Sequence, residues 1–199
     1  MSVSGPTTES PATSTAINAL RAAGERGDAD AVAELLAPDV VFHSPMSERI
    51  LFEGKAEVTA LHRDIFAVLE DIETTEPLGL GDTRSFSFRA RVRGVELEAS
   101  NLVRFNEQGQ IVECTVFVRP LASLATLFSA LPPRVSARRR GRLHGALVAS
   151  VAWPLAFVLR IVDRLTPIFL ATGCRSSTCR SARLRATTRC PARQGLRCR

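Results

Sequence analysis

Two consecutive stretches, residues 84–94 and 95–105, alternate between apolar and polar side chains and most constrain what this chain can fold into. Successive side chains of a β-strand point to opposite faces, so each stretch predicts a strand with one apolar face. A two-residue turn at Arg93-Gly94 predicts that the strands form an antiparallel hairpin. The expected inner rows are Phe86, Phe88, Ala90 and Val92 on the first strand and Leu97, Ala99, Asn101, Val103 and Phe105 on the second.

The outer face of this hairpin is charged. The same turn places Arg91 opposite Glu96 and Arg89 opposite Glu98, and each such pair contributes about 0.2–1 kcal/mol. Arg89, Arg91 and Arg93 could also form a phosphate-binding strip, but the register favours a solvated, self-neutralised face. Aromatic side chains are not interleaved with these bases, so nucleic acid is not an expected partner.

A third strand is expected after a four-residue turn at residues 106–109. This turn predicts that Asn101 pairs with Cys114, Val103 with Val112 and Ala99 with Val116 on the inner face, and that Glu96 lies opposite Arg119 on the outer face. Asn101 is the one polar member of its inner row. A buried amide without a partner costs about 1–3 kcal/mol, so Asn101 either has a structural partner or lines a cavity that holds water or a ligand.

The first half of the chain predicts helices followed by a short buried strand. A helical pattern runs from about residue 16 to Gly27, and Asp28 is the expected N-cap of a second helix that ends before Pro38. Residues 40–43 predict a strand that Ser44-Pro45 ends, because proline cannot donate to a ladder. A short strand within residues 48–53 and a helix over residues 55–69 follow.

Two segments, RGDADAVAELLAPDVVFHSP and NLVRFNEQGQIVECTVF, resemble the second helix with the first strand, and the last hairpin, of the nuclear transport factor 2-like superfamily. The resemblance covers about residues 16–119. It implies an α+β fold shaped like a cone, in which a curved mixed or antiparallel sheet wraps around three N-terminal helices. The superfamily includes isomerases, dehydratases, cyclases, epoxide hydrolases and non-enzymatic binders, so the resemblance does not fix one reaction.

Comparison with ketosteroid isomerase, an enzyme of this superfamily, places three residues of this chain at its catalytic positions. Leu20 stands where that enzyme has a tyrosine donor, Ser44 where it has the base aspartate and Asn101 where it has a protonated aspartate. All three depart from that pattern, and the chain contains no tyrosine. The nearer likeness is therefore to the SnoaL-like branch, whose small-ligand pockets support diverse chemistry.

Three residues are candidates for catalysis: His43 and His62 as general bases, and Asn101 as a hydrogen-bond donor. For each histidine the alternative is a packing role, with His43 at the rim of the sheet and His62 beside Val58 and Phe66 on its helix. The expected ligand is small and apolar or lipid-like, in a pocket between the helices and the sheet. Its further lining residues would be Leu20, Ser44, Phe86, Phe88, Leu97 and Ala99.

No metal or organic cofactor is implied by the sequence. The spacing of the four C-terminal cysteines includes no C-x-x-C pair, and no histidine accompanies them, which argues against a zinc site. These are Cys174, Cys179, Cys190 and Cys198. The chain opens without a secretory signal, so a cytoplasmic location is expected for the body.

Charge divides the chain into a body and a basic C-terminal part. Residues 121–199 contain 15 arginines and Asp163 as their sole acidic residue, whereas residues 1–120 contain 11 basic and 19 acidic residues. Residues 121–131 predict a short helix stopped by Pro132-Pro133. After the basic run SARRRGR, residues 145–159 are uncharged, and their helical stripe is Leu147, Val148, Val151, Leu155, Val158, Leu159, Val162 and Leu165.

This C-terminal segment, residues 134–171, predicts a helix that lies on or enters a membrane, because the preceding arginines would attract anionic lipids. The alternative is a helix packed on the body or on a second copy. The expected organisation is a disordered lead (1–14), a SnoaL-like domain (15–120), a helical appendage (121–172) and a disordered tail (173–199). Two functions stay open: an isomerase-, hydrolase- or cyclase-type enzyme, or a non-catalytic homodimeric module tethered to a membrane.

Overall fold

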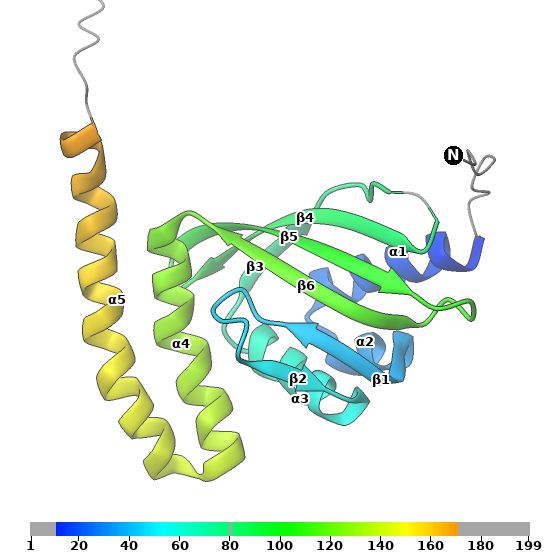
Figure 1. Ribbon diagram of the computed structural model, residues 1–199, viewed down its shortest axis with the longest axis horizontal. Helices are drawn as coiled ribbons and strands as arrows, with labels where there is room; N and C mark the ends of the chain where they lie inside the picture. The colour runs from blue at the N-terminus through cyan, green and yellow to red at the C-terminus, as the bar shows by residue number, and fades with distance from the viewer. Residues whose placement is uncertain (1–10, 80, 171–199) are drawn as a thin grey trace, which may run out of the picture.

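The computed structural model describes residues 11–79 and 81–170, which form a curved, unclosed sheet with helices against its inner face and a helical hairpin at one side (Figure 1). The α+β class predicted from the sequence is confirmed. The helices are α1 (Pro11–Arg26), α2 (Ala29–Leu35), α3 (Lys55–Phe66), α4 (Leu121–Arg140) and α5 (Arg142–Leu170). The strands are β1 (Leu36–His43), β2 (Leu51–Glu53), β3 (Glu70–Thr74), β4 (Thr83–Val92), β5 (Val95–Phe105) and β6 (Ile111–Arg119).

The sheet is mixed, with the order β2-β1-β6-β5-β4-β3. β1 pairs with β6 in parallel, and the other neighbours are antiparallel. The parallel pair brings the first strand of the chain beside the last. Strand β3 at the edge was not predicted, because its sequence EDIET is mostly polar and its residues are at most partly buried.

The start of the chain follows the prediction with shifted boundaries. Asp28 caps α2 as expected, since its Oδ1 accepts a hydrogen bond from the Ala31 N–H at 2.9 Å. Helix α1 begins at Pro11, so the predicted lead of residues 1–14 is wrong over its last four positions, and residues 1–10 lie outside the described part. β1 begins at Leu36 and contains Pro38, where the register with β6 shifts and no ladder donor is needed.

The β4–β5 hairpin has the predicted register, with Arg91 opposite Glu96 and Arg89 opposite Glu98. Arg93 and Gly94 both have positive φ, as a two-residue primed turn requires. The ion pairs on the outer face nevertheless run to the other neighbouring strands. Arg91 pairs with Asp71 of β3, and the Nε of Arg119 on β6 donates to Glu98 Oε2 at 2.8 Å.

The predicted register between β5 and β6 is wrong by two residues. Asn101 lies opposite Val116, Val103 opposite Cys114 and Ala99 opposite Val118, and Arg119 faces Glu98 instead of Glu96. The loop closes through Asn106 and Gln110, and an irregularity between Arg104 and Phe105 adds the rest of the shift. Because side chains alternate with a period of two, a two-residue shift keeps the inner row inside.

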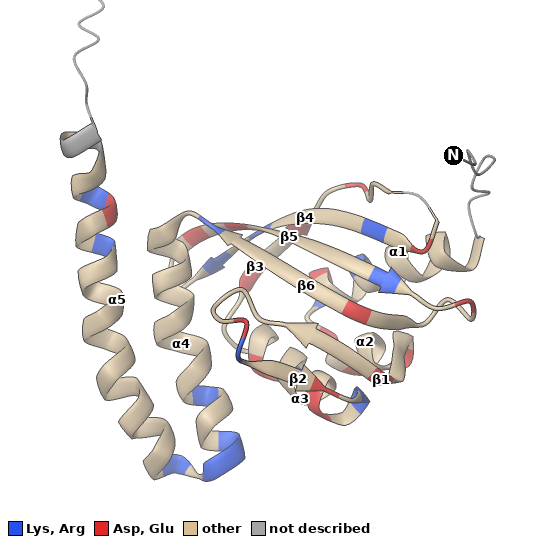
Figure 2. Cartoon of the chain, in the orientation of Figure 1, with Lys and Arg blue, Asp and Glu red and all other residues tan. Residues whose placement is uncertain are grey.

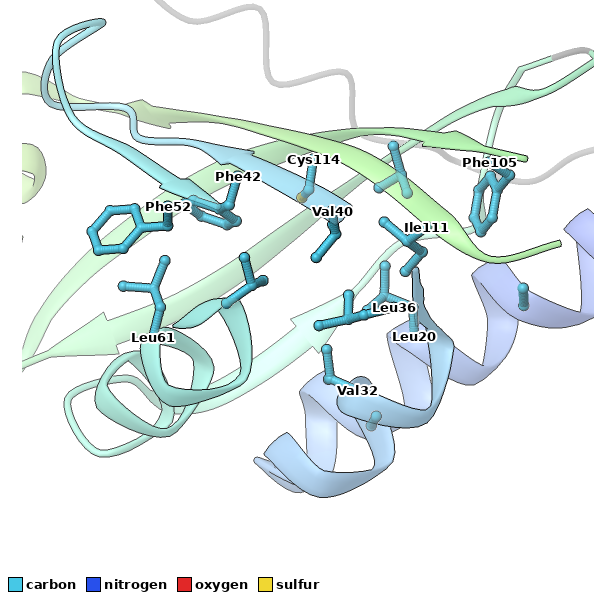
Figure 3. Close-up of a cluster of buried hydrophobic side chains, with 14 of the residues drawn as sticks. Leu20, Val32, Leu36, Val40, Phe42, Phe52, Leu61, Phe105, Ile111 and Cys114 are labelled. Carbon is cyan, nitrogen blue, oxygen red and sulfur yellow. The ribbon is translucent and has the colours of Figure 1, made fainter. Parts of the chain in front are cut away.

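Two apolar clusters hold the domain together. In the larger one, Leu20, Val32 and Leu61 of the N-terminal helices point toward Phe42 and Ile111 of the sheet (Figure 3). In the second cluster, Leu127 and Ala130 of α4 pack against buried residues of β4 and β5. Helix α4 is therefore part of the domain core rather than an appendage to it.

The prediction that Pro132-Pro133 ends this helix is wrong, because α4 continues to Arg140. Each proline removes a backbone donor, but tertiary contacts on both sides of α4 outweigh that cost. Arg138 of α4 donates from its Nε to Asp64 Oδ2 at 2.7 Å and from its Nη2 to Glu57 Oε1 at 3.0 Å, which ties the end of the helix to α3.

Helix α5 packs on α4 through small residues. Gly145, Ala152 and Ala156 are buried, whereas most of the predicted apolar stripe turns away from the protein. Leu147, Val151, Val158 and Leu165 are all exposed. The predicted tail, residues 173–199, lies outside the described residues.

Candidate functional site

A cavity of about 410 Å³ lies between the N-terminal helices, the inner face of the sheet and helix α4. Its volume falls in the range of about 300–1,000 Å³ that is usual for small-molecule sites. Most of the wall is apolar. The apolar lining includes Leu20, Phe42, Phe52, Leu61, Phe66, Phe86, Phe88, Leu97, Val116, Leu127, Leu131 and Val135.

Asn101 lines this cavity, as its place in the inner row of β5 predicted. Its neighbours in that row, Ala99 and Val103, are buried. Within the described part of the chain, the Asn101 side chain forms no hydrogen bond. The amide is therefore available to a molecule in the cavity.

His62 of α3 also lines the cavity and is held between aromatic rings. Its ring centroid lies 5.9 Å from that of Phe42 and 5.8 Å from that of Phe66. The Nδ1 atom lies 2.8 Å from the Val58 carbonyl oxygen, which can only accept, so the proton is on Nδ1. In the neutral ring Nε2 then carries the lone pair.

Burial lowers the pKa of His62 below its ordinary value of 6.5, and the hydrogen bond to Val58 opposes this shift. The imidazole is consequently neutral at physiological pH. A neutral ring with an unprotonated Nε2 is the form that can take a proton from a ligand.

Most of the other predicted lining residues meet at the same cavity. Leu20, Ser44, Phe86, Phe88 and Leu97 all contribute to its wall. The Ser44 Oγ also accepts a hydrogen bond from the Met46 N–H at 3.2 Å, which orders the loop after β1.

His43 and Ala99 are not among the lining residues. His43 points to the outer face of β1, where its Nε2 lies 3.0 Å from Glu113 Oε1. The strand alternation explains this, because Phe42 and Ser44 occupy the cavity side. Ala99 is buried in the second apolar cluster, under α4. The structure therefore supports the rim alternative for His43 rather than the role of a base.

Thr74 of β3 and four further polar residues of the cavity wall, Ser136, Arg139, Arg140 and His144, were not predicted from the sequence. The last four belong to α4 and α5. They lie where α4 turns into α5. The signal was present in the run SARRRGR, which was interpreted as a lipid-binding segment. That run could be connected with the cavity only once the helix was known to continue past Pro132-Pro133.

Cys114 of β6 was also missed as a lining residue. Burial raises the pKa of its thiol to about 12, so the group stays protonated and is a poor nucleophile. Among the described residues, no carboxylate lines the cavity. Around its apolar interior the site thus offers the neutral imidazole of His62, the amide of Asn101 and hydroxyl groups, with Arg139, Arg140 and His144 at the α4–α5 turn.

Comparison with known proteins gives a consistent picture. The sequence model of the SnoaL-like domain matches residues 17–114. No curated protein matches the chain. A steroid delta-isomerase from Pseudomonas aeruginosa is similar in structure, with a TM-score of 0.61 and 26% identity over 67% of this chain and 98% of that one.

Two further solved structures share the fold. A protein with a cystatin-like fold from Silicibacter pomeroyi has a TM-score of 0.61 and 23% identity, covering 67% of this chain and 94% of its own. A nuclear transport factor 2-like protein of unknown function from Mesorhizobium loti has a TM-score of 0.52 and 21% identity, covering 58% of this chain and 97% of its own.

Proposed function

Residues 17–114 belong to the SnoaL-like family within the nuclear transport factor 2-like superfamily, and from this premise we propose that the domain binds a small apolar molecule in its cavity. The observation that carries the proposal is the cavity of about 410 Å³ whose wall is mainly apolar and contains the unpaired amide of Asn101. Apolar walls with a few placed polar groups are typical of small-molecule sites.

The chemistry that these groups support best is a proton transfer. Nε2 of His62 would accept a proton from the ligand, and Asn101 would donate a hydrogen bond to an oxygen on which negative charge develops. The similarity to a steroid delta-isomerase favours a ring-containing ligand and an isomerase-type reaction. The site lacks the tyrosine and the carboxylates of the ketosteroid isomerase pattern described in the sequence analysis. A hydrolase or cyclase reaction could therefore use His62 and Asn101 equally well.

A thermal-shift screen of apolar ketones, sterols and acyl compounds tests this proposal. We expect at least one compound to raise the melting temperature of the wild type, and Asn101→Leu to abolish the response to ligands that accept a hydrogen bond. Ser100→Ala, on the outer face of the same strand, is the matched control and should respond as the wild type does. Equal responses of wild type and Asn101→Leu to every ligand would remove Asn101 from the site.

A second candidate function is a non-catalytic homodimeric module tethered to a membrane through α5. Its support is the exposed apolar surface of that helix, where Leu147, Val151 and Trp153 are each at least 60% exposed. By length and composition alone, Arg142–Thr166 is sufficient to cross a membrane. In this reading the domain is cytoplasmic and α5 lies on or enters the bilayer.

Flotation with vesicles that contain phosphatidylglycerol tests the tether. The wild type should float with the vesicles at low salt, because apolar burial and arginine attraction add together. The double variant Val151→Asp with Val158→Asp should stay at the bottom of the gradient. Gln108→Glu, which adds an acid in the exposed turn between β5 and β6, is the control. A wild type that remains soluble at low salt would contradict the tether.

A further inference from the structure

The two ends of the cavity wall differ in polarity. Its interior is formed by aliphatic and aromatic side chains, whereas its rim at the α4–α5 turn includes Arg139, Arg140 and His144. Basic residues gather at this turn, and little charge lies along the adjacent length of α5 (Figure 2). A ligand that fills this site therefore meets an apolar environment at one end, and two arginines and an imidazole at the other.

Some of the rim cations are already neutralised by the domain. Arg139 donates from its Nε to Glu57 Oε1 at 2.9 Å, and its guanidinium lies 4.7 Å from the centroid of the Phe52 ring. Arg138 binds Glu57 and Asp64, and the Arg134 Nε lies 3.6 Å from Asp64. The hydrogen bonds from Arg138 and Arg139 lower the pKa of Glu57, and that from Arg138 is the larger cause.

Arg140 and His144 are different, because neither forms an ion pair or a side-chain hydrogen bond within the described part of the chain. Arg140 is exposed and His144 partly exposed, and both line the cavity. Glu57 and Asp64, the acidic residues of this region, are engaged by three other arginines, Arg134, Arg138 and Arg139. The rim thus has an excess of positive charge with its donors unused.

We propose that the ligand of this cavity is an amphiphile with an anionic head, whose apolar part fills the interior and whose carboxylate or phosphate binds Arg140 and His144 at the rim. The inference rests on the proposed function, since it assigns a ligand class to the same cavity. An anion inside the apolar interior would pay a large desolvation cost, so the head lies at the rim. A guanidinium binds carboxylate and phosphate oxygens in a two-pronged geometry, which favours these heads over a neutral one.

These rim residues lie outside the part of the chain that matches the family, which ends at residue 114. The hairpin of α4 and α5 thus adds a recognition element of its own to the SnoaL-like domain.

Isothermal titration calorimetry tests the inference with dodecanoate and dodecyl phosphate below their critical micelle concentrations and with dodecanol below its solubility limit. We expect at least one anionic probe to bind the full-length wild type about tenfold more tightly than dodecanol. The double variant Arg140→Gln with His144→Gln should bring that ratio close to one and leave dodecanol binding unchanged. The two anionic probes distinguish a carboxylate from a phosphate head.

Two kinds of control separate this inference from the proposed function. Arg142→Gln removes a neighbouring charge that does not line the cavity, so it should keep the wild-type ratio. Two substitutions narrow the cavity, Val116→Trp from the sheet and Leu131→Phe from α4. If it folds, each variant should bind none of the three probes. Equal binding of the three probes to the wild type would overturn the anionic head but keep the apolar site. Binding that both narrowed variants retain would overturn the cavity as the site for either proposal.

Discussion

At the scale of single residues, His62 combines a fixed tautomer with an apolar setting. Its Nδ1 donates to the Val58 carbonyl, and the rings of Phe42 and Phe66 lie on either side. These contacts hold the ring in place, and its burial keeps it neutral by lowering its pKa. They also make the stability of the protein depend on pH.

We predict that the free energy of unfolding falls as the pH is lowered from 7 toward 5. The pKa of His62 is lowered in the folded protein, so above the ordinary value of 6.5 the ring is neutral in both states and the full stability is present. Below that value the unfolded chain binds the proton first, and stability is lost until the pH reaches the folded pKa. Urea unfolding of wild type and His62→Gln at several pH values measures this, and the variant should lose less stability over the interval. Parallel curves would contradict the assignment.

Sequence reasoning placed Asn101 on the inner face of the sheet but left His43 open between the rim of the sheet and the pocket. Asn101 is the third of five alternating inner positions on its strand, and the strand cannot change their phase without exposing the whole row. His43 lies on a short strand with apolar residues on both faces, Val41 outside and Phe42 inside, so its phase was ambiguous. Alternation predicts the face of a residue only where the two faces differ in polarity.

At the scale of secondary-structure elements, the close approach of α5 to α4 depends on a glycine. A Cβ at position 145 would lie 2.7 Å from the Ala137 Cβ and 2.8 Å from the Pro133 carbonyl oxygen. Real Cβ atoms are not found this close to backbone atoms, so the two helices would have to separate.

We predict that Gly145→Leu destabilises the hairpin by about 1–3 kcal/mol, the usual cost of overpacking. Limited proteolysis should cut the α4–α5 turn faster in this variant, and hydrogen exchange should increase in α5. Ala146→Leu, at the next and exposed position, is the matched control and should behave as the wild type does. Unchanged protection of α5 in Gly145→Leu would show that the hairpin is not packed as described.

The sequence predicted most of the strands and helices but not the C-terminal end of α4. Local rules correctly identify Asp28 as a cap and Arg93-Gly94 as a turn, because both features depend on neighbouring residues. Whether a helix continues through Pro132-Pro133 depends instead on what packs against both sides of it. That information is tertiary, and the cavity rim was missed for the same reason.

At the scale of the whole molecule, the outer face of the sheet exposes large apolar side chains. Phe117 is 58% exposed and Leu102 is 42% exposed, and they lie on neighbouring strands β6 and β5. Such a patch on a sheet is a natural contact for a second copy of the chain.

We predict that the protein is a homodimer and that Phe117→Glu shifts it toward the monomer. A charge placed at a buried contact would lack a partner, whereas on a free surface it costs little. Light scattering coupled to size-exclusion chromatography measures the mass of each variant. Val158→Asp tests the competing surface on α5: loss of the dimer in this variant alone would assign the interface to the helix.

Helix α4 belongs both to the cavity wall, through Leu127, Leu131 and Val135, and to the support of α5. A guest molecule gains those contacts only while α4 stays docked on the sheet. The two equilibria are linked: if packing of α4 on the sheet favours ligand binding by a given free energy, ligand binding favours the packing of α4 by the same amount. A change that displaces α5, and α4 with it, would therefore also change the affinity for the ligand in the cavity.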